Sequence, residues 1–417
     1  MNPYRKAAWI GIAAMTLFAG ACSNSPQSPA GSGNPLDKPS ESPPIETSHA
    51  PTAAVEQPPP EPVRREATLI AVGDIMVHTP QLPAYYDAAS KRYTFNPWFE
   101  QVKPIFQSGD WVFGNLETPL AGQALKYTGY PRFNAPAELA NALADAGFDV
   151  VSTANNHTMD RGFPGIVRTL ENVRKSGLVP VGTAADADDA ERLTIVEREG
   201  IKMGFLAYTY GTNGIPIPED KAFSVNLIDS ERIVKEIASL RNAGADVVAV
   251  SLHFGLEYHR MPNKQQIQLA RKLIASGADI VLGSHPHVVQ PLERVSVPAS
   301  ESIDGIARSG VVIYSLGNFI SNQSGDWKDV GLILTINVVK TEHADGTSSI
   351  ELKQVETMPT WVHIESIRKQ RYYTIIPLEQ ALLSRNDPKL KPQEYAAMQR
   401  MLDGMNEHLK QHVDSAE

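Results

Sequence analysis

Short apolar runs alternate with segments of helical periodicity from about residue 68 onward. Each run is rich in valine and isoleucine, as expected for a strand that is buried on both faces. The segments between the runs repeat apolar residues at the 3.6-residue spacing of a helix, and they end at glycine, as helix C-termini often do. Strands are predicted at 68–74, 111–117, 149–157, 246–255, 279–287 and 310–319, and helices at 136–147, 164–177, 230–244 and 263–277.

Three further segments complete the pattern. Residues 192–211 predict a hairpin that turns near Gly200, and 332–359 predict a second hairpin with its loop at 341–347, where Asp-Gly is a turn signal. Residues 392–411 predict an amphipathic helix. The alternation of strands and helices indicates an α/β domain with mostly parallel central sheets plus some antiparallel strands.

The first 66 residues do not follow this pattern. Arg5 and Lys6 precede 15 uncharged, mostly apolar residues that end at Cys22, which is typical of a secretory signal and too short to span a bilayer comfortably. From Ser23 to Arg65 the chain has eleven prolines and no aromatic residue, so this segment cannot bury enough apolar surface to fold. We therefore expect a signal peptide at 1–22 and a disordered tether at 23–66.

The remaining chain is long enough for one large domain. We expect this domain at 67–345, with a C-terminal strand and helix extension at 346–417 that packs on the same domain. Cys22 is the only cysteine, so an intrachain disulfide is excluded and the core must supply the stability. The formal net charge of -9 and the lack of a Lys/Arg cluster argue against a nucleic-acid partner.

Residue types that bind metals stand where the predicted strands end. In chain order they are Asp74 and His78, Glu117, Asn155, Asn156 and His157, His253, and His285 with His287. Ligands of open α/β sheets bind at the carboxyl ends of the strands, so these loops should converge. A single histidine at such a place is more often a hydrogen-bonded loop residue, and adjacent asparagines often only make a turn. Their coincidence at five strand ends predicts a metal site.

The number of candidate ligands indicates a pair of metals. Five imidazoles, two carboxylates and an amide exceed the four ligands of a closed zinc site, and a carboxylate can bridge two ions. Mixed nitrogen and oxygen ligation without thiolate suits Zn, Mn or Fe. We therefore expect two divalent ions, whose identity the sequence leaves open.

Six ordered motifs resemble those of the CapA-type family of bacterial poly-γ-glutamate capsule biosynthesis proteins. They are AVGDIMVH, GNLETPL, ANNHTMDRG, SLHFGLEY, GSHPHVVQ and YSLGNFIS, and the likeness covers about residues 67–322. The resemblance implies a membrane-tethered extracytoplasmic protein with a calcineurin-like metallophosphoesterase fold, a layered α/β sandwich. AGAC at 19–22 resembles the lipobox of bacterial lipoproteins, in which Cys22 would be lipidated; an uncleaved anchor is the alternative.

The metallophosphoesterase pattern also implies roles for single residues. Asp74 and His78 resemble its first-strand ligands, although they are four residues apart rather than two, and Glu117 resembles its bridging carboxylate, although Asn115 stands in the more usual Asp position. The other implied metal ligands are Asn156, His253, His285 and His287. Pro286 stiffens the turn between the last two histidines, which could reach different ions. The two departures leave catalysis open.

Six other residues complete the predicted site. His157 resembles the histidine that contacts the leaving group, and Asp160 either orients it or caps the following helix. Substrate-binding candidates are Arg132, which could clamp an anion or be an ordinary loop residue, Glu257 and Tyr258, which could line the cleft or be structural, and Asn318 at the edge of the site. We expect the aromatic residues of 111–114 and 208–211 to lie in the core.

Three functions of different classes are compatible with these features. The first is synthesis, release or export of poly-γ-glutamate or a similar anionic surface polymer, together with membrane-bound capsule synthesis components and with the membrane anchor at Cys22. The second is a surface phosphoesterase that acts on another substrate. The third is a polymer-binding scaffold without catalysis. In each case we expect a lipoprotein anchored outside the cytoplasm.

Overall fold

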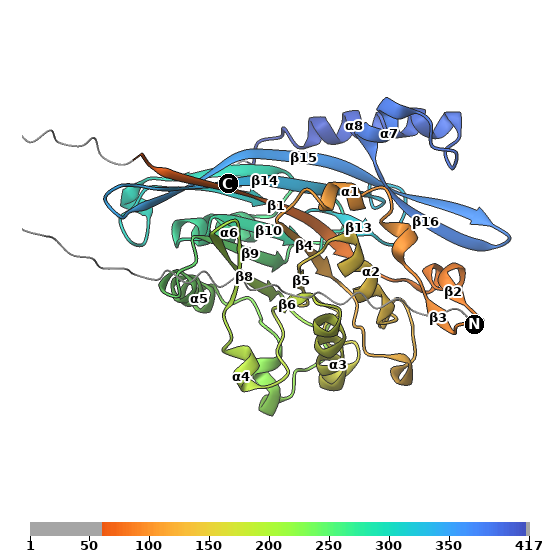
Figure 1. The fold of residues 1–417 in the computed structure, drawn as a ribbon. Coiled ribbons are helices and arrows are strands. Elements are labelled where there is room, and N and C mark those ends of the chain that lie inside the picture. The colour runs from red at the N-terminus through yellow and green to blue at the C-terminus, as the bar shows by residue number, and fades with distance from the viewer. Residues whose placement is uncertain (1–60, 414–417) are drawn as a thin grey trace, which may run out of the picture. The chain divides into compact units, whose positions relative to one another are not determined.

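The structure is a computed structural model that describes residues 61–413 (Figure 1). The predicted signal peptide and nearly all of the predicted tether lie outside these residues. In the described part of the chain, none of the helices combines the length and the apolar composition needed to cross a membrane.

The larger of two mixed sheets has eight strands. Its order is β16-β15-β14-β1-β4-β5-β6, and β13 also pairs with β1. The first four strands in chain order are mutually parallel, and β14, β15 and β16 are antiparallel to their neighbours. The strands are β1 (Val63–Ile75), β4 (Trp111–Leu116), β5 (Val150–Ser152), β6 (Val179–Val181), β13 (Asn318–Ile320), β14 (Val330–Glu342), β15 (Ser348–Ile367) and β16 (Gln370–Pro377).

The second sheet has six strands in the order β11-β12-β10-β9-β8-β7. Its four central strands are parallel, and β7 and β11 are antiparallel edges. The strands are β7 (Thr194–Arg198), β8 (Ile201–Thr209), β9 (Val247–His253), β10 (Ile280–Ser284), β11 (Leu292–Val297) and β12 (Arg308–Ile313); β2 (Tyr86–Asp87) and β3 (Arg92–Tyr93) form a separate small hairpin.

Within residues 61–413, eight α-helices surround the sheets. They are α1 (Lys103–Phe106), α2 (Glu138–Ala146), α3 (Gly162–Lys175), α4 (Ala187–Ala190), α5 (Ser230–Asn242), α6 (Lys264–Ala275), α7 (Leu378–Ser384) and α8 (Pro392–His408). Asn263 and Gln266 form the predicted capping box at the start of α6, and each side chain accepts from the other residue's backbone N–H. The buried residues of α6 recur at helical spacing, so one face packs on the second sheet.

The two sheets pack face to face, and helices cover their outer faces. A buried cluster between the sheets contains Leu69 and Phe113 from the first sheet and Phe205, Val247 and Ile280 from the second. A second cluster lies under α2 and a third under α5 and α6. In Figure 1, α7 and α8 lie along β15. The predicted layered α/β sandwich is confirmed.

Two glycines allow close strand contacts immediately before candidate ligands. A Cβ atom on Gly73 would lie 1.9 Å from the Gly317 carbonyl oxygen, and one on Gly283 would lie 1.9 Å from that of Tyr314. A side chain at either position would push the neighbouring backbone away. The glycines therefore bring β1 and β10 against their neighbours one or two residues before Asp74 and His285.

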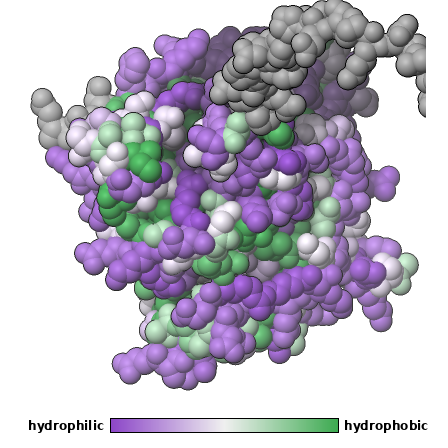
Figure 2. Space-filling view, turned by 60° about the vertical axis from the view of Figure 1, so that its left-hand side comes forward, coloured by the Kyte–Doolittle hydropathy of each residue, from purple (hydrophilic) through white to green (hydrophobic). Residues whose placement is uncertain are grey.

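The predicted strand and helix segments are present, with three main differences. β1 begins at Val63, inside the predicted tether, because residues 63–66 pair with 339–342 of β14. β5 is only three residues long, so the chain leaves the sheet before Ala154. The strands β2, β3, β6, β11 and β16 and the helices α1, α4 and α7 were not predicted. The face drawn in Figure 2 is mostly hydrophilic, with apolar residues in smaller separate areas, in keeping with a folded domain exposed to water.

Candidate metal centre

Acidic and imidazole side chains converge where β1, β4, β9 and β10 end. Three groups of side chains have ligand atoms that all lie within 4.8 Å of one another, and this spacing could hold a metal ion. The groups are Asp74, Glu117 and His287; Glu117, His253 and His285; and Glu257, His285 and His287. Apart from Glu257, which is exposed, all of these side chains are buried.

Glu117 is common to two of the groups. Its Oε1 atom lies 3.6 Å from His253 Nε2 and 3.8 Å from His287 Nε2, and it has no hydrogen-bond partner among the described residues. The buried Nδ1 atom of His285 likewise has none within residues 61–413. Buried polar atoms are nearly always paired, so unpaired oxygen and nitrogen atoms on two residues of the same candidate ligand group fit a bound cation.

Asn115 forms hydrogen bonds with both acids, Asp74 and Glu117. Its Nδ2 atom lies 2.8 Å from Asp74 Oδ1, 3.3 Å from Glu117 Oε2 and 3.3 Å from His253 Nδ1. Asn155 in turn donates to the Leu116 carbonyl at 2.8 Å, which ties the loop after β5 to the end of β4. Asparagine at position 115 thus supplies a donor between two carboxylates, where aspartate would add a third negative charge.

The electrostatics of these groups have one common cause, burial. Burial, and then the charge of Asp74, raise the pKa of Glu117 well above its usual range. Burial, and then the neighbouring His285, lower the pKa of His253 well below its usual value, and burial lowers the pKa of His285 to about 3. Neutral imidazoles are the form that binds metals, and a cation would favour ionised Glu117. The donor set, with nitrogen and oxygen ligands only, fits a divalent ion.

The histidine pair lies on a backbone of unusual conformation. His285 and His287 have φ values of +98° and +58°, and Tyr258 has +66°. Tyr258 donates its backbone N–H to the Pro286 carbonyl at 2.7 Å, between the two histidines. Left-handed residues other than glycine are costly and cluster at functional sites. Here His285 belongs to the group with Glu117 and His253, His287 to the group with Asp74 and Glu117, and both to the group with Glu257.

His78 is not brought into any of the three groups. Its Nδ1 atom accepts from the Asn322 backbone N–H at 3.3 Å, and its ring packs edge-on against Phe133 at 5.1 Å. Burial lowers the pKa of His78 to about 4. Of the two predicted first-strand ligands, only Asp74 joins a group, because the four-residue spacing carries His78 past the end of β1.

Asn156 and His157 lie beside the groups on the loop after β5. Asn156 Oδ1 is 3.2 Å from His253 Nε2. His157 Nδ1 is 2.7 Å from Asp160 Oδ2, and Phe133 packs edge-on against the His157 ring at 4.5 Å. The N-cap of α3 is Arg161, so the alternative role of Asp160 as a helix cap is wrong, and the side chain orients His157 instead.

The four candidate substrate-binding residues have different surroundings. Arg132 is exposed next to Phe133, and Tyr258 is exposed with its ring 6.0 Å from that of His287. Glu257 lies within reach of both histidines, so it is a candidate ligand as well as a cleft residue. Asn318 is fully buried, and its Oδ1 lies 3.1 Å from His287 Nδ1, so it supports that ring rather than facing a substrate.

The sequence led us to expect both Tyr208 and Tyr210 in the core, and this is correct only for Tyr208. Tyr208 is fully buried, whereas Tyr210 is 49% exposed and packs against His285 with ring centroids 4.7 Å apart. Its backbone N–H donates to the His253 carbonyl at 3.0 Å. Only the packing of β8 beside β9 shows that Tyr210, just past the end of its strand, borders the centre.

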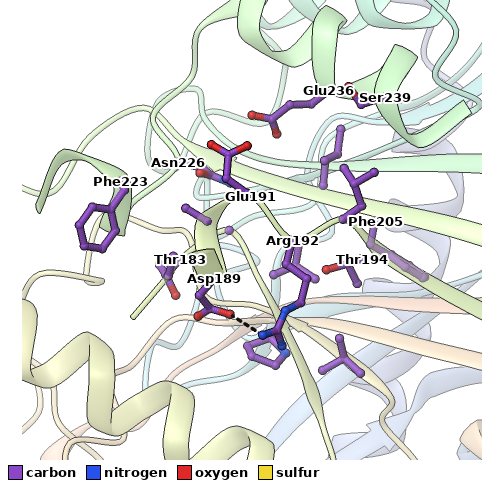
Figure 3. Close-up of a pocket in the computed structure, with 18 of the residues that line it drawn as sticks. Thr183, Asp189, Glu191, Arg192, Thr194, Phe205, Phe223, Asn226, Glu236 and Ser239 are labelled. Carbon is purple, nitrogen blue, oxygen red and sulfur yellow. Dashed lines mark ion pairs between the residues drawn. The ribbon is translucent and has the colours of Figure 1, made fainter. Parts of the chain in front are cut away.

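A separate cavity of about 730 Å³ lies between β6, β7 and α5 (Figure 3). It is large, but two of the three acids that line it, Asp189 and Glu236, are already paired with arginines, and the third, Glu191, is exposed. Asp189 accepts two hydrogen bonds from Arg174, at 2.6 and 2.7 Å, and Glu236 accepts from Arg232 at 2.6 Å. None of the three candidate metal groups borders it. The size of this cavity therefore does not make it the candidate functional site. The groups at the strand ends are the better candidate, because they contain buried ligand atoms without hydrogen-bond partners among the described residues.

Comparison with known proteins agrees with the motifs. The family model of the bacterial capsule synthesis protein PGA_cap matches residues 68–323. The PGA biosynthesis protein CapA of Bacillus subtilis (strain 168) is 29% identical over 305 residues, which are 72% of this chain and 74% of that protein. The capsule biosynthesis protein CapA of Bacillus anthracis is 28% identical over 266 residues, 61% of this chain and 60% of that protein.

Two solved structures have a related arrangement at low similarity. The calcineurin-like phosphoesterase YfkN from Bacillus subtilis has a TM-score of 0.42 and 16% identity, and the alignment covers 84% of this chain and 100% of that chain. The 5'-nucleotidase precursor from Thermus thermophilus has a TM-score of 0.41 and 16% identity over 70% of this chain and 54% of that chain. On the extent of the family match, the chain belongs to the bacterial capsule synthesis protein PGA_cap family.

Proposed function

We propose that this protein acts in the synthesis or export of poly-γ-glutamate or a similar anionic surface polymer, through a centre that holds two divalent metal ions. The observation that carries the paired centre is Glu117, which belongs both to the group with Asp74 and His287 and to the group with His253 and His285. A carboxylate shared in this way can bridge two ions. The capsule role is supported by family membership and by the names of the two Bacillus relatives.

The location is part of the proposal. The apolar segment that ends at Cys22 and the proline-rich sequence after it support a lipoprotein that is tethered to the outer surface of the cell membrane. Its partners would be the anionic polymer and membrane-bound components of capsule synthesis. Bound metals would supply local positive charge to a chain whose net charge is -9.

The residues around the centre support hydrolysis or transfer of a phosphoryl or acyl group as the reaction. Bound divalent ions would polarise the reacting oxygen and stabilise the negative charge that develops on it. Asp160 accepts a hydrogen bond from His157 Nδ1, which fixes the ring; when the ring also carries a proton on Nε2, that proton can pass to a leaving group. Phe133, fully buried, packs against the same ring and excludes water from one side of it.

Metal content and turnover test this proposal. Full-length wild type should contain about two divalent ions per chain and hydrolyse an aryl phosphate, whereas Glu117→Gln should lose metal. His157→Gln should keep its metal and lose turnover by about 10²- to 10⁴-fold, the range for a general acid. Wild type without metal would contradict the paired centre. Metal without turnover would favour the polymer-binding scaffold.

A cell-based experiment tests the capsule role. Deletion of the gene should reduce surface polymer, and the wild-type gene should restore it, whereas Glu117→Gln should not. Normal polymer in the deletion strain would exclude a capsule function and favour the alternative of a surface phosphoesterase with another substrate. Restoration by His157→Gln at the wild-type level would show that the centre binds without catalysis.

A further inference from the structure

We propose that the C-terminal helix α8 positions His287, and that this helix, which lies beyond the family-matched residues 68–323, thereby sets the metal affinity of the centre. This inference rests on the proposed metal site. Two sets of contacts, which share His408, lead from α8 toward the same histidine.

The first route runs through the backbone. His408, at the end of α8, is buried, and its Nε2 atom lies 3.0 Å from the Val289 carbonyl oxygen. A carbonyl only accepts, so Nε2 carries the hydrogen and donates. Val289 follows His287 by two residues. Met405 of α8 belongs to the same buried cluster as Val289, so the end of the helix packs on the segment that follows the histidine pair.

The second route runs through Trp327. Its ring contacts the guanidinium of Arg260, which lies 4.2 Å from the ring centroid, and the ring of His408, which lies edge-on at 5.5 Å between centroids. Trp327 has a φ value of +64° and the preceding Asp326 has +55°, so both hold a left-handed conformation that bulky residues rarely adopt. The packing of α8 and Arg260 on the ring stabilises this turn.

The turn at Trp327 connects directly to the centre. The next carbonyl, that of Lys328, accepts from Asn318 Nδ2 at 2.8 Å, and Asn318 Oδ1 lies 3.1 Å from His287 Nδ1. Asp74 Oδ2 also lies 3.1 Å from Nδ1. Both neighbours accept, so Nδ1 carries the hydrogen and Nε2 is left as the ligand atom that faces Glu117. A hydrogen-bonded outer partner of this kind fixes the ring and tunes metal affinity.

Gly404 allows α8 to pack closely against Trp327. A Cβ atom at this position of α8 would lie 3.0 Å from Cζ2 of Trp327. Glycine inside a helix costs stability relative to alanine, so its presence has a packing reason here, which is the close approach of the indole ring. Movement of α8 would therefore be transmitted to Trp327 and from there to Asn318.

The molecule contains a matched control for this contact. His363 on β15 is also buried, also packs edge-on against a tryptophan (Trp361, 4.9 Å between centroids), and also contacts α8, because its Nε2 lies 3.2 Å from Glu394 Oε1. Trp361 packs with the buried cluster of α7 and α8. Neither His363 nor Trp361 contacts a candidate metal ligand within the described residues, so this pair fastens the helix without reaching the centre.

Metal binding by full-length variants tests the inference. We expect His408→Leu to weaken Mn²⁺ binding about tenfold, at the lower end of the 10- to 100-fold range for outer partners of a ligand. His408→Gln should restore binding because its amide can donate to the Val289 carbonyl. His363→Leu should lower the thermal midpoint as His408→Leu does but leave Mn²⁺ affinity within about twofold of wild type, because it does not reach the ligands. The absorption spectrum of the Co²⁺-substituted protein should change with His408→Leu and not with His363→Leu.

The possible failures are distinguishable. If wild type binds no Mn²⁺, the proposed metal site fails, and this inference with it. If wild type binds Mn²⁺ and both leucine variants bind it as tightly as wild type, α8 only adds stability. The inference is then overturned while the metal site stands. If His408→Leu does not fold, Gly404→Ala provides the second test, because displacement of Trp327 should weaken Mn²⁺ binding in a folded protein; unchanged affinity there would also overturn the inference.

Discussion

The metal centre and the cavity beside α5 are two concentrations of charged residues that differ in how their charges are compensated. In the cavity, Asp189 and Glu236 accept hydrogen bonds from arginines. In the centre, Asp74 and Glu117 face histidines rather than arginines or lysines, and Glu117 Oε1 has no partner among the described residues. Buried acids without a cationic side chain are costly, and a metal ion would compensate them. The difference teaches that incomplete charge compensation, rather than cavity volume, marks the candidate functional region.

The largest expected effect that separates the two regions is acidification of the metal-free protein. His78, His253 and His285 have pKa values below the usual 6.5, so between pH 6.5 and about 4 the unfolded chain takes up protons that the native protein does not. Stability therefore falls with falling pH, by up to about 1.4 kcal/mol per pH unit for each histidine. Urea unfolding of chelator-treated protein at a series of pH values measures this.

The contribution of the cavity's ion pair to stability should not change over the same pH range. Burial raises the pKa of Asp189, but hydrogen bonds from Arg174 and a backbone amide outweigh it, and the pKa is lowered overall. Its ion pair is therefore lost only at lower pH. Stability of the metal-free protein that stays constant from about pH 6.5 to about 5 would contradict the burial of neutral histidines at the centre.

The next largest effect is that Glu117→Gln should change stability in opposite directions without and with metal. In metal-free protein, Glu117→Gln should stabilise the fold by about 1 to 3 kcal/mol, because it removes a buried acid whose Oε1 atom lacks a partner among the described residues. With metal present at about a thousand times its Kd, wild type gains about 4 kcal/mol, and the variant should gain much less. Unfolding curves with chelator and with Mn²⁺ measure both. A variant that is less stable in both conditions would contradict the reasoning.

The smallest effect concerns the cavity. Asp189→Asn should cost about 1 to 2 kcal/mol, because it breaks the pair with Arg174, whose side chain is 38% exposed, and leaves the guanidinium without its partner. Metal content should not change. Arg192→Gln is the matched control, since Arg192 lies 3.8 Å from Asp189 and is 69% exposed, and it should cost less than about 0.5 kcal/mol. Metal loss in Asp189→Asn would show that the two regions are coupled.

The order of strands and helices and most candidate ligands could be predicted from sequence, because they depend on local periodicity and on strand ends. His78 is an exception. Its position after β1 indicates a ligand, but its Nδ1 atom accepts a hydrogen bond from the backbone N–H of Asn322, 244 residues away. Asn318 was expected at the edge of the site, and its full burial follows from its pairing beside Asp74. The N-terminal signal and tether remain predictions.

The sequence by itself determined the family, the alternation of β and α elements, and the presence of acids and imidazoles at successive strand ends, since each of these is encoded in neighbouring residues. Only the tertiary structure decided that Glu117 is shared by two groups, that Tyr210 borders them, and that His408 of α8 contacts the chain two residues after His287. These contacts join residues that are far apart along the chain. They depend on how two sheets pack and on how far each strand extends, which local pattern does not specify.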